Sequence, residues 1–267
     1  MKDFILLIPY YNDIEGLTVS LKSVVYQPDK FDILIVDDGS RIKLDETALQ
    51  NLLPGVTIKI LSLNENKGVA VALNTGLKEL NKRTDFKYIA RLDCGDTSSP
   101  NRFTEQVKFL DKYTDIYLLG SWCQFTDTTT GKSYLYKTKT EHTDIIKEMH
   151  FKCSFIHPTV MFRREVLDTV GYYPENYPHA EDYAYFWKII RQFKGALLPE
   201  VLVNVTTNMQ AISAKNYKVQ VKSRIAVIKD FGTNKLLIIC GVIGATLRRI
   251  VPYRLIMKTK LLLKIIN

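Results

Sequence analysis

Two acidic side chains stand at the end of a buried strand that the sequence predicts at residues 33–36. Asp37 and Asp38 come directly after that apolar run, and Gly39 and Ser40 follow them. Carboxylates at the carboxyl end of a strand can accept hydrogen bonds from a nucleotide base and its ribose. An acidic turn with Ser40 as a helix cap explains this motif equally well when it is taken alone.

A second acidic turn closes a later apolar run, residues 86–92. It reads Asp93-Cys94-Gly95-Asp96, and paired acids here could hold a divalent cation, Mg²⁺ or Mn²⁺, against a diphosphate. The alternative is a turn in which a carboxylate bonds the backbone, with Asp96 near a helix start. Two acidic strand ends in one sheet favour a ligand site more than either does alone.

A carboxylate pair, Glu181 and Asp182, begins an aromatic-rich segment that is predicted as a helix over residues 181–192. An acid held firmly there could act as a general base, which needs a carboxylate within hydrogen-bond reach of the hydroxyl that it deprotonates. The alternative is an acid pair that merely favours the helix start through the macrodipole. His157, which precedes Pro158, could mark a ligand-facing turn, although such a histidine is more often a packed or capping residue.

Asn66, Gly68, Asn74 and Gly76 mark a turn that enters a helix. Small residues at a helix start allow a ligand to approach the backbone N–H groups closely. A tight turn followed by an ordinary helix is at least as good an interpretation of these residues alone.

Short apolar runs alternate with helix-like segments through the first half of the chain, which is typical of a parallel sheet flanked by helices. The predicted strands are residues 4–9, 33–36, 57–63 and 86–92; the predicted helices are residues 14–26, a segment ending near residue 80, and one opening at Pro100. The polar clusters therefore lie at the carboxyl ends of strands, where open α/β sheets bind ligands.

The second half of the chain is less regular. It contains a polar, threonine-rich stretch at 126–140 and a predicted strand around 159–162. After the helix at 181–192, we expect a last short strand following Pro199 and long helices from about residue 211.

The composition fits one globular unit, because 267 residues with 46% hydrophobic content can bury one sizeable core. The four cysteines form no C-x-x-C pair, which argues against a zinc knuckle or a disulfide framework and favours a reducing compartment. The N-terminal apolar run is too short for a signal peptide, and residues 236–247 are fewer than the ~20 needed to span a bilayer. We therefore expect a cytoplasmic protein.

The net charge of +9 is carried by the C-terminal part of the chain. Residues 208–267 hold twelve Lys and Arg and one acidic residue, which leaves 25 basic and 27 acidic side chains in residues 1–207. Between Arg248 and Lys264, basic and aliphatic residues alternate in an imperfect amphipathic pattern that predicts contact with an anionic membrane surface. The alternative is a basic, solvated helix that packs its apolar side on the domain.

Taken in order, these motifs resemble glycosyltransferase family 2. The matching segments are IPYYND at 8–13, VDDGS at 36–40, NKGVAVALNTGL at 66–77, RLDCGD at 91–96, HPTVMFRREV at 157–166 and AEDYAYFWKI at 180–189. The resemblance covers about residues 3–207 and implies the α/β GT-A fold, a Rossmann-like mixed sheet flanked by helices. It implies a transferase domain at 1–207, with a nucleotide-binding half at about 1–98 and an acceptor half at about 99–207, followed by a basic helical C-terminal extension at 208–267.

The resemblance also assigns roles to residues. Asp38 resembles the carboxylate that reads the base, usually uracil or thymine, and Asp182 occupies the family's general-base position with Glu181 beside it. His157 would lie on the acceptor side, and Asp93 and Asp96 are the expected cation ligands. The implied donor-binding residues are Pro9, Tyr11, Asp37, Asp38, Lys67, Gly68, Asn74, Arg91 and Asp93.

The implied reaction is transfer of one sugar, with inversion, from a UDP- or dTDP-linked donor to a hydroxyl of a glycan or lipid-linked glycan in surface polysaccharide synthesis. Residues 126–150 are expected to contribute to acceptor choice, and the enzyme is expected on the inner face of the membrane. The sequence departs from the family at Gly95, where a metal-binding carboxylate is usual, and at Leu73, where members often carry Arg. The Q-x-x-R-W motif of processive synthases is absent, which indicates one sugar per encounter.

Two other classes of protein are alternatives. The basic tail suggests a nucleic-acid-binding protein, but the aromatic residues are concentrated in the near-neutral part and no recognised reader motif is present. A nucleotide-sugar-forming enzyme of related fold would need a glycine-rich phosphate loop after the first strand, where this chain has PYYND. We therefore expect a sugar donor, a glycan acceptor and a membrane surface as partners, and no nucleic acid.

Overall fold

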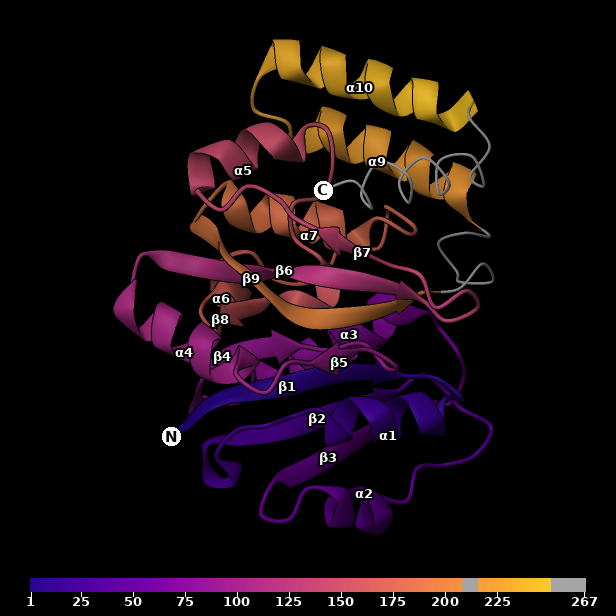
Figure 1. Cartoon of the computed structure of the whole chain (residues 1–267), viewed down its shortest axis with the longest axis vertical. Helices are drawn as coiled ribbons and strands as arrows, with labels where there is room; N and C mark the ends of the chain where they lie inside the picture. The colour runs from indigo at the N-terminus through magenta and orange to yellow at the C-terminus, as the bar shows by residue number, and fades with distance from the viewer. Residues whose placement is uncertain (208–215, 251–267) are drawn as a thin grey trace.

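One mixed β-sheet forms the centre of the molecule, with helices on both of its faces (Figure 1). The computed structural model describes residues 1–207 and 216–250. The strands follow the order β3-β2-β1-β4-β8-β6-β9-β5, and β7 pairs with β6. The strands are β1 (Lys2–Tyr10), β2 (Phe31–Asp37), β3 (Thr57–Ser62), β4 (Phe86–Arg91), β5 (Thr97–Ser98), β6 (Ile116–Asp127), β7 (Ser133–Tyr136), β8 (Met161–Arg163) and β9 (Lys194–Thr207).

The helices connect these strands and continue past the last of them. They are α1 (Ile14–Lys22), α2 (Glu46–Leu52), α3 (Val69–Leu80), α4 (Arg102–Lys112), α5 (His142–Met149), α6 (Val166–Thr169), α7 (Glu181–Ile190), α9 (Tyr217–Phe231) and α10 (Lys235–Ile250), with the short 3₁₀ turns η1 (Pro28–Lys30) and η2 (His157–Thr159). The predicted alternation of strands and helices in the first half is confirmed.

The strands β1 to β4 are parallel. β1, β2 and β4 are buried on both faces, as continuous apolar runs predict, whereas β3 at the edge of the sheet is partly exposed. Phe4, Leu6 and Ile8 of β1 face one hydrophobic cluster, which includes apolar residues of α1, α2 and α4. Ile5 and Leu7 face the other cluster, which includes residues of α3, α5 and α7. Because successive side chains of a strand point to opposite faces, one strand supplies both cores.

The second half of the sheet is built on β6 and β9, which run parallel to each other. A strand follows Pro199 as predicted, but it is the long β9, which already begins at Lys194. The register shifts between the pairs Ser121–Leu198 and Trp122–Val201, so that Pro199 falls in a bulge. A proline fits there because a residue in a bulge makes no ladder hydrogen bond, so the missing N–H group of proline costs nothing.

The threonine-rich stretch at 126–140 forms part of a hairpin. The strand β7 pairs antiparallel with the end of β6, and Asp127 accepts hydrogen bonds from the backbone N–H groups of Thr129 and Thr130 at 2.9 and 2.8 Å. This turn holds the aromatic side chains of β7 beside those of β6, with the Phe125 and Tyr134 rings stacked at 5.2 Å.

The helix α9 packs on α7 beside the sheet, and α10 lies on the outer side of α9 (Figure 1). Val227 and Ile228 of α9 join the core, and the Tyr177 hydroxyl donates to Asp230 at 2.8 Å. His150 Nε2 accepts hydrogen bonds from the backbone of the α9–α10 turn, at 3.1 Å from Thr233 N. Long helices near the end were predicted; the division of the chain at residue 207 stays a prediction.

The amphipathic pattern that ends at Lys264 falls mainly on residues 251–267, which lie outside the described part of the chain. Among residues 1–207 and 216–250, no helix combines the length and apolarity that a membrane span requires.

Substitutions at two glycines of α10 test whether this helix must pack closely against His150. A Cβ atom at Gly241 would overlap the carbonyl oxygen of His150, whereas one at Gly244 would meet nothing within 4 Å. We expect Gly241→Ala to lower the free energy of unfolding by about 1–3 kcal/mol, because overpacking forces α10 outward. Gly244→Ala should raise it by up to about 1 kcal/mol through helix propensity.

Urea denaturation followed by circular dichroism measures both effects. Equal effects of the two substitutions would show that α10 does not need its close contact with His150.

Candidate functional site

The loops that follow β1 and β2 are fastened to each other at the carboxyl edge of the parallel strands. The Asn12 N–H donates to Ser40 Oγ, and the Arg41 N–H donates to Asn12 Oδ1, both at 2.9 Å. A cavity of about 640 Å³ lies along these loops, and its lining includes Tyr11 and Leu44. Tyr11 is about half exposed, so its ring is available to a ligand.

Asp37 and Asp38 are both buried, and each holds backbone N–H groups. Asp37 accepts from Ser40 N at 3.0 Å, as the acidic-turn interpretation requires. Ser40 caps no helix, because the next helix begins at Glu46 with Asp45 as its cap. Asp38 accepts from Lys67 N at 2.8 Å and from Gly68 N at 2.9 Å, and thereby draws the turn before α3 to the sheet. A carboxylate has about four acceptor positions, so Asp38 retains capacity for a ligand.

The side chains that flank this turn have different surroundings. Lys67 is half exposed and lies 3.5 Å from Glu65. Asn74 is buried, and its amide exchanges hydrogen bonds of 2.9 Å with the backbone of Tyr173. Asn74 therefore positions the 173–175 loop, and its donor-binding role stays a prediction.

A fully buried guanidinium, that of Arg91, joins the acidic turn to the sheet. It donates to Asp93 Oδ1 at 2.5 Å, to the carbonyl oxygen of Leu7, and to His157 Nε2 at 3.3 Å. The His157 ring nitrogen also lies 2.9 Å from the Tyr173 hydroxyl. The structure thus brings Arg91, Asp93 and His157 together, as their predicted roles in one site require.

Burial and the positive charge of Arg91 lower the pKa of His157 to about 3, so the imidazole is neutral at physiological pH. Because Arg91 can only donate, His157 Nε2 is an acceptor and the proton of the ring is assigned to Nδ1. That nitrogen lies 3.9 Å from Asp93 Oδ2. His157 is therefore a neutral orienting group beside Asp93, and its acceptor-side role stays a prediction.

The two acids of the second turn are not equivalent. Asp93 is about one-third exposed, whereas Asp96 is buried and accepts from Thr206 N at 2.8 Å. Burial, together with the negative charge of Asp93, raises the pKa of Asp96 to about 8. Gly95 between them has φ +92°, a conformation that disfavours a side chain, and this explains the glycine at that position.

This arrangement bears on the predicted cation. The described residues contain no group of three or more His, Cys, Asp or Glu side chains that could hold a metal ion. A site built from one carboxylate and substrate phosphates is common for Mg²⁺, and Asp93 is the exposed carboxylate that fits it. A direct role for Asp96 as a ligand stays a prediction.

The carboxylates Glu181 and Asp182 stand at the first turn of α7, whose body is buried in the core. Asp182 Oδ1 accepts from the backbone N–H of Tyr183 at 2.7 Å. Burial and the neighbouring charge of Glu181 raise the pKa of Asp182 to about 7, and burial also raises the pKa of Glu181. The Asp93 charge acts in the same direction on both, which places the acidic turn and the α7 start in one electrostatic neighbourhood.

Asp182 lines a cavity of about 200 Å³, which shares no lining residue with the cavity along the loops that follow β1 and β2. Its wall includes Phe125, Tyr134 and Tyr136 of the β6–β7 hairpin, together with Gln220 and Arg224 of α9. The threonine-rich stretch was expected to contribute to acceptor choice, but these individual residues were not predicted. No sequence signal links Arg224 to Asp182, because their proximity arises from the packing of α9 against α7.

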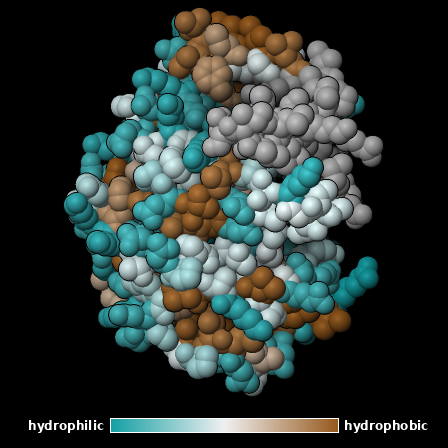
Figure 2. All heavy atoms as spheres, in the orientation of Figure 1, coloured by the Kyte–Doolittle hydropathy of each residue, from teal (hydrophilic) through white to brown (hydrophobic). Residues whose placement is uncertain are grey.

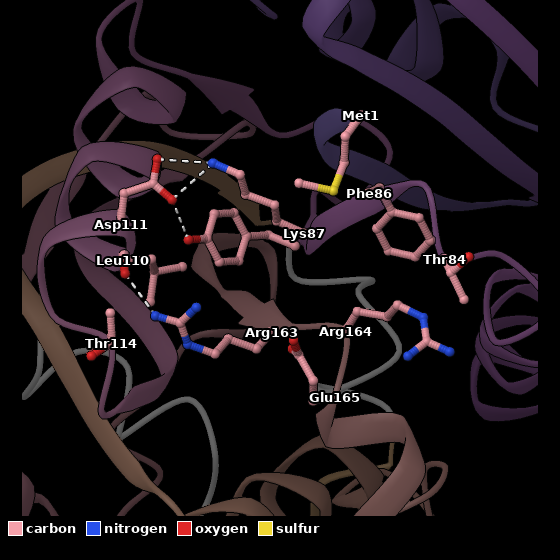
Figure 3. Close-up of a pocket in the computed structure, with 11 residues that line it drawn as sticks. Met1, Thr84, Phe86, Lys87, Leu110, Asp111, Thr114, Arg163, Arg164 and Glu165 are labelled. Carbon is pink, nitrogen blue, oxygen red and sulfur yellow. Dashed lines mark hydrogen bonds and ion pairs between the residues drawn. The ribbon is translucent and has the colours of Figure 1, made fainter.

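A third cavity, of about 320 Å³, lies at the opposite, amino-terminal end of β4 (Figure 3). Its Lys87 bonds Asp111 at 3.1 Å, and the Tyr88 hydroxyl donates to the same carboxylate at 2.6 Å. Arg163 donates to the Leu110 carbonyl at 2.6 Å. These groups bind one another and brace α4 against the sheet.

Comparisons with known proteins agree with this geometry. Residues 5–171 match the family model described as Glycosyl transferase family 2. Amylovoran biosynthesis glycosyltransferase AmsE of Erwinia amylovora is 29% identical over 233 residues, 85% of this chain and 84% of AmsE. The UDP-Gal:alpha-D-GlcNAc-diphosphoundecaprenol beta-1,3-galactosyltransferase of Escherichia coli is 28% identical over 192 residues, 72% of this chain and 67% of that protein.

Bifunctional glycosyltransferase pgtA of Dictyostelium discoideum is 27% identical over 246 residues, which are 79% of this chain and 32% of pgtA. This chain thus spans about one third of that relative.

Solved structures share the fold at low sequence identity. S. aureus TarS 1–349 in complex with UDP-GlcNAc has a TM-score of 0.66 and 18% identity, covering 91% of this chain and 72% of that chain. Mannosyltransferase PcManGT from Pyrobaculum calidifontis, in complex with GDP-Man and Mn2+, has a TM-score of 0.62 and 16% identity, covering 90% and 68%. The predicted GT-A arrangement is confirmed.

A substitution at Arg91 tests whether its buried hydrogen bonds stabilise the site. We expect Arg91→Lys to lower the free energy of unfolding by about 1–3 kcal/mol, because an ammonium cannot bond Leu7, Asp93 and His157 at once and leaves a buried acceptor unpaired. Chemical denaturation measures the loss. The exposed Arg41 is the matched control, and Arg41→Lys should change stability by less than about 0.5 kcal/mol. An unchanged Arg91→Lys midpoint would contradict the role assigned to the guanidinium fork.

Proposed function

Because this chain belongs to glycosyl transferase family 2, we propose that it transfers one sugar, with inversion, from a nucleoside diphosphate sugar to a hydroxyl group of a glycan or lipid-linked glycan. The observation that carries the proposal is the Asp182 carboxylate, which has a raised pKa, faces a cavity and responds to the charge of Asp93. The family favours a transferase over a nucleic-acid-binding protein or a nucleotide-sugar-forming enzyme.

In the proposed reaction, Asp182 takes the proton of the acceptor hydroxyl as its oxygen attacks the anomeric carbon. The bond from that carbon to the diphosphate oxygen breaks on the opposite face, so the configuration is inverted and the nucleoside diphosphate leaves. A base works best when its pKa is near the working pH, and burial of Asp182 together with the Glu181 charge moves it there.

The donor would bind along the carboxyl ends of β1, β2 and β4. Tyr11 and Pro9 would lie against the base, Asp38 would accept its N–H, and Lys67 would lie near the phosphates. The Escherichia coli UDP-Gal transferase and the TarS complex with UDP-GlcNAc support a UDP-linked donor, and dTDP is the second candidate.

A cation would be held by Asp93 together with the diphosphate, and Mn2+ in the PcManGT complex supports Mg²⁺ or Mn²⁺ here. When bound, it would screen the negative charge that develops on the leaving diphosphate. The Arg91 guanidinium orients Asp93 by donating to its Oδ1 atom at 2.5 Å. Asp96 fixes the turn to β9 by accepting a hydrogen bond from Thr206 N.

The names of AmsE and of the Escherichia coli galactosyltransferase support a place in polysaccharide assembly on a lipid-linked acceptor. Such an acceptor lies at a membrane, so we propose that the protein binds the inner, cytoplasmic face of that membrane without crossing it.

The face of α10 that points away from α9 supports this placement. Leu236, Ile239, Ile243 and Leu247 are 67%, 57%, 55% and 60% exposed, and their spacing puts them on one side of the helix. Figure 2 shows hydrophobic surface at the end of the molecule where α10 lies in Figure 1. The chain from residue 208 on holds twelve basic residues and one acidic residue. An apolar stripe joined to a basic segment suits an anionic bilayer, which attracts each nearby Lys or Arg by about 1 kcal/mol.

The mechanism is tested at Asp182. We expect Asp182→Asn to reduce sugar transfer by about 10²–10⁴-fold while nucleotide affinity stays within about threefold. Calorimetry with UDP, dTDP, GDP and CDP, each with and without Mn²⁺, measures affinity and identifies the donor class. In the wild type, kcat/KM should rise with pH up to about 7, because the base must be deprotonated and its pKa is raised to that value.

Glu181→Gln is the matched control and should keep more activity than Asp182→Asn, because it removes a neighbouring charge and not the base. Substantial turnover by Asp182→Asn would exclude this residue as the base.

The membrane contact is tested with vesicles that contain phosphatidylglycerol. We expect the double substitution Ile239→Glu and Ile243→Glu to weaken co-sedimentation at least about tenfold, since each buried aliphatic side chain contributes about 1.5–3 kcal/mol. The control, Val19→Glu with Val25→Glu, adds the same charge at two positions that are each 50% exposed.

If the control weakened binding equally, the stripe would not be the contact. Sedimentation velocity without lipid would reveal the competing outcome, in which a second copy of the chain covers α10.

A further inference from the structure

We propose that α9 completes the acceptor site with an anion-binding position, in which Arg224 binds a phosphate or carboxylate group carried by the acceptor sugar. This inference rests on the proposed function and deepens it. It assigns to the C-terminal part of the chain a direct role in substrate choice, beside its contact with the membrane.

Two polar residues of α9 face the same cavity as Asp182. Gln220 and Arg224 are four residues apart and therefore lie on one side of the helix. Arg224 is half-buried, with its guanidinium 5.5 Å from the centre of the Tyr183 ring. The Tyr183 ring thus supports the guanidinium plane at the edge of the cavity.

Within the described residues, Arg224 takes part in no hydrogen bond or ion pair. Most other arginines of the interior are bonded; Arg91, Arg102 and Arg163 each donate to backbone carbonyls. A guanidinium carries five N–H donors, and a half-buried one needs acceptors to offset its lost hydration. Planar, bidentate acceptors such as phosphate and carboxylate match this fork best.

The charge of the cavity also favours an anion. Arg224 is the permanently charged side chain of its lining, which also contains Asp182 and His179. In the part of the chain that the structure describes, no ion pair joins Arg224 to Asp182. Arg224 lowers the pKa of Asp182, but burial and Glu181 raise it by more, so that Asp182 is partly protonated near pH 7. The lining then has a net charge between zero and positive.

Three aromatic side chains of the β6–β7 hairpin line the same cavity. Phe125 and Tyr134 stack with an interplanar angle of 20°, and Tyr136 meets Phe125 edge-on at 5.8 Å. Flat apolar rings suit the C–H face of a sugar ring. One acceptor sugar could therefore rest on the wall, present a hydroxyl to Asp182 and place an anionic substituent at Arg224.

The position of α9 suggests where such a substituent would come from. Figure 1 shows α9 between α7, which carries Asp182, and α10, which carries the exposed apolar stripe. A sugar that is joined through phosphate to a lipid would reach the cavity from the α10 side with its ring foremost, and its phosphate would remain on the side of α9. An acidic sugar would meet Arg224 through its carboxylate instead.

The test compares anionic and neutral sugars as probes of the full chain saturated with UDP. N-acetylglucosamine 1-phosphate and glucuronic acid are titrated by saturation-transfer NMR beside N-acetylglucosamine and glucose. We expect at least one anionic sugar to bind about tenfold more tightly than its neutral partner, and the tighter of the two identifies phosphate or carboxylate as the source. Arg224→Gln should abolish the difference.

Lys222→Gln is the matched control, because it removes the same charge from an exposed position of the same helix. Equal binding of anionic and neutral sugars by the wild type, or equal losses in the two variants, would overturn the proposal. If Arg224→Gln does not fold, Arg224→Lys keeps the charge without the fork and should lose most of the preference.

UDP affinity, measured in parallel, separates this inference from the proposed function. A protein that binds UDP but shows no anion preference refutes the Arg224 site alone, whereas absence of nucleotide binding refutes the transferase assignment itself.

Discussion

Two buried arginines support the seam between the halves of the sheet. Arg91 ends β4, which pairs parallel with β1 and antiparallel with β8. Arg102 of α4 donates to the Arg91 carbonyl at 2.7 Å, and both side chains are fully buried. Burial and the charge of Arg91 lower the pKa of Arg102 to about 9, while Asp96 and Asp93 act in the opposite direction. The acidic turn is therefore the counter-charge of this pair as well as a candidate ligand site.

These two roles of the acidic turn explain why it carries Gly95 where the family usually has a carboxylate. Asp93 neutralises Arg91, Asp96 is anchored to Thr206, and Gly95 adopts a left-handed conformation. A carboxylate at the third position would have to occupy that strained conformation. The turn thus keeps one exposed carboxylate, which is enough only when the diphosphate contributes further oxygen atoms.

The parts of the site that the sequence predicts are those in which chemistry follows a strand directly. Asp38 and Asp93 could be proposed because a parallel strand and its terminal turn are local in sequence, whereas Asp182 was proposed from the family resemblance of the segment at 180–189. The start of β9 was mispredicted since a bulge carries Pro199, and the contribution of Arg224 could not be predicted at all. Contacts between α9 and α7 depend on packing over long sequence separations, which leave no periodic signal.

The seam also contributes to the strength of the base. Burial and Glu181 raise the pKa of Asp182 most, Asp93 adds to the rise through its negative charge, and a diphosphate bound beside Asp93 would add charge of the same sign. Any positive group near the phosphates would therefore have two effects. It would stabilise the leaving group, and it would keep Asp182 deprotonated. Arg224 acts on Asp182 from the other side and lowers its pKa. An anionic acceptor group that pairs with Arg224 would weaken this effect, so donor, acceptor and base are linked through the same few charges.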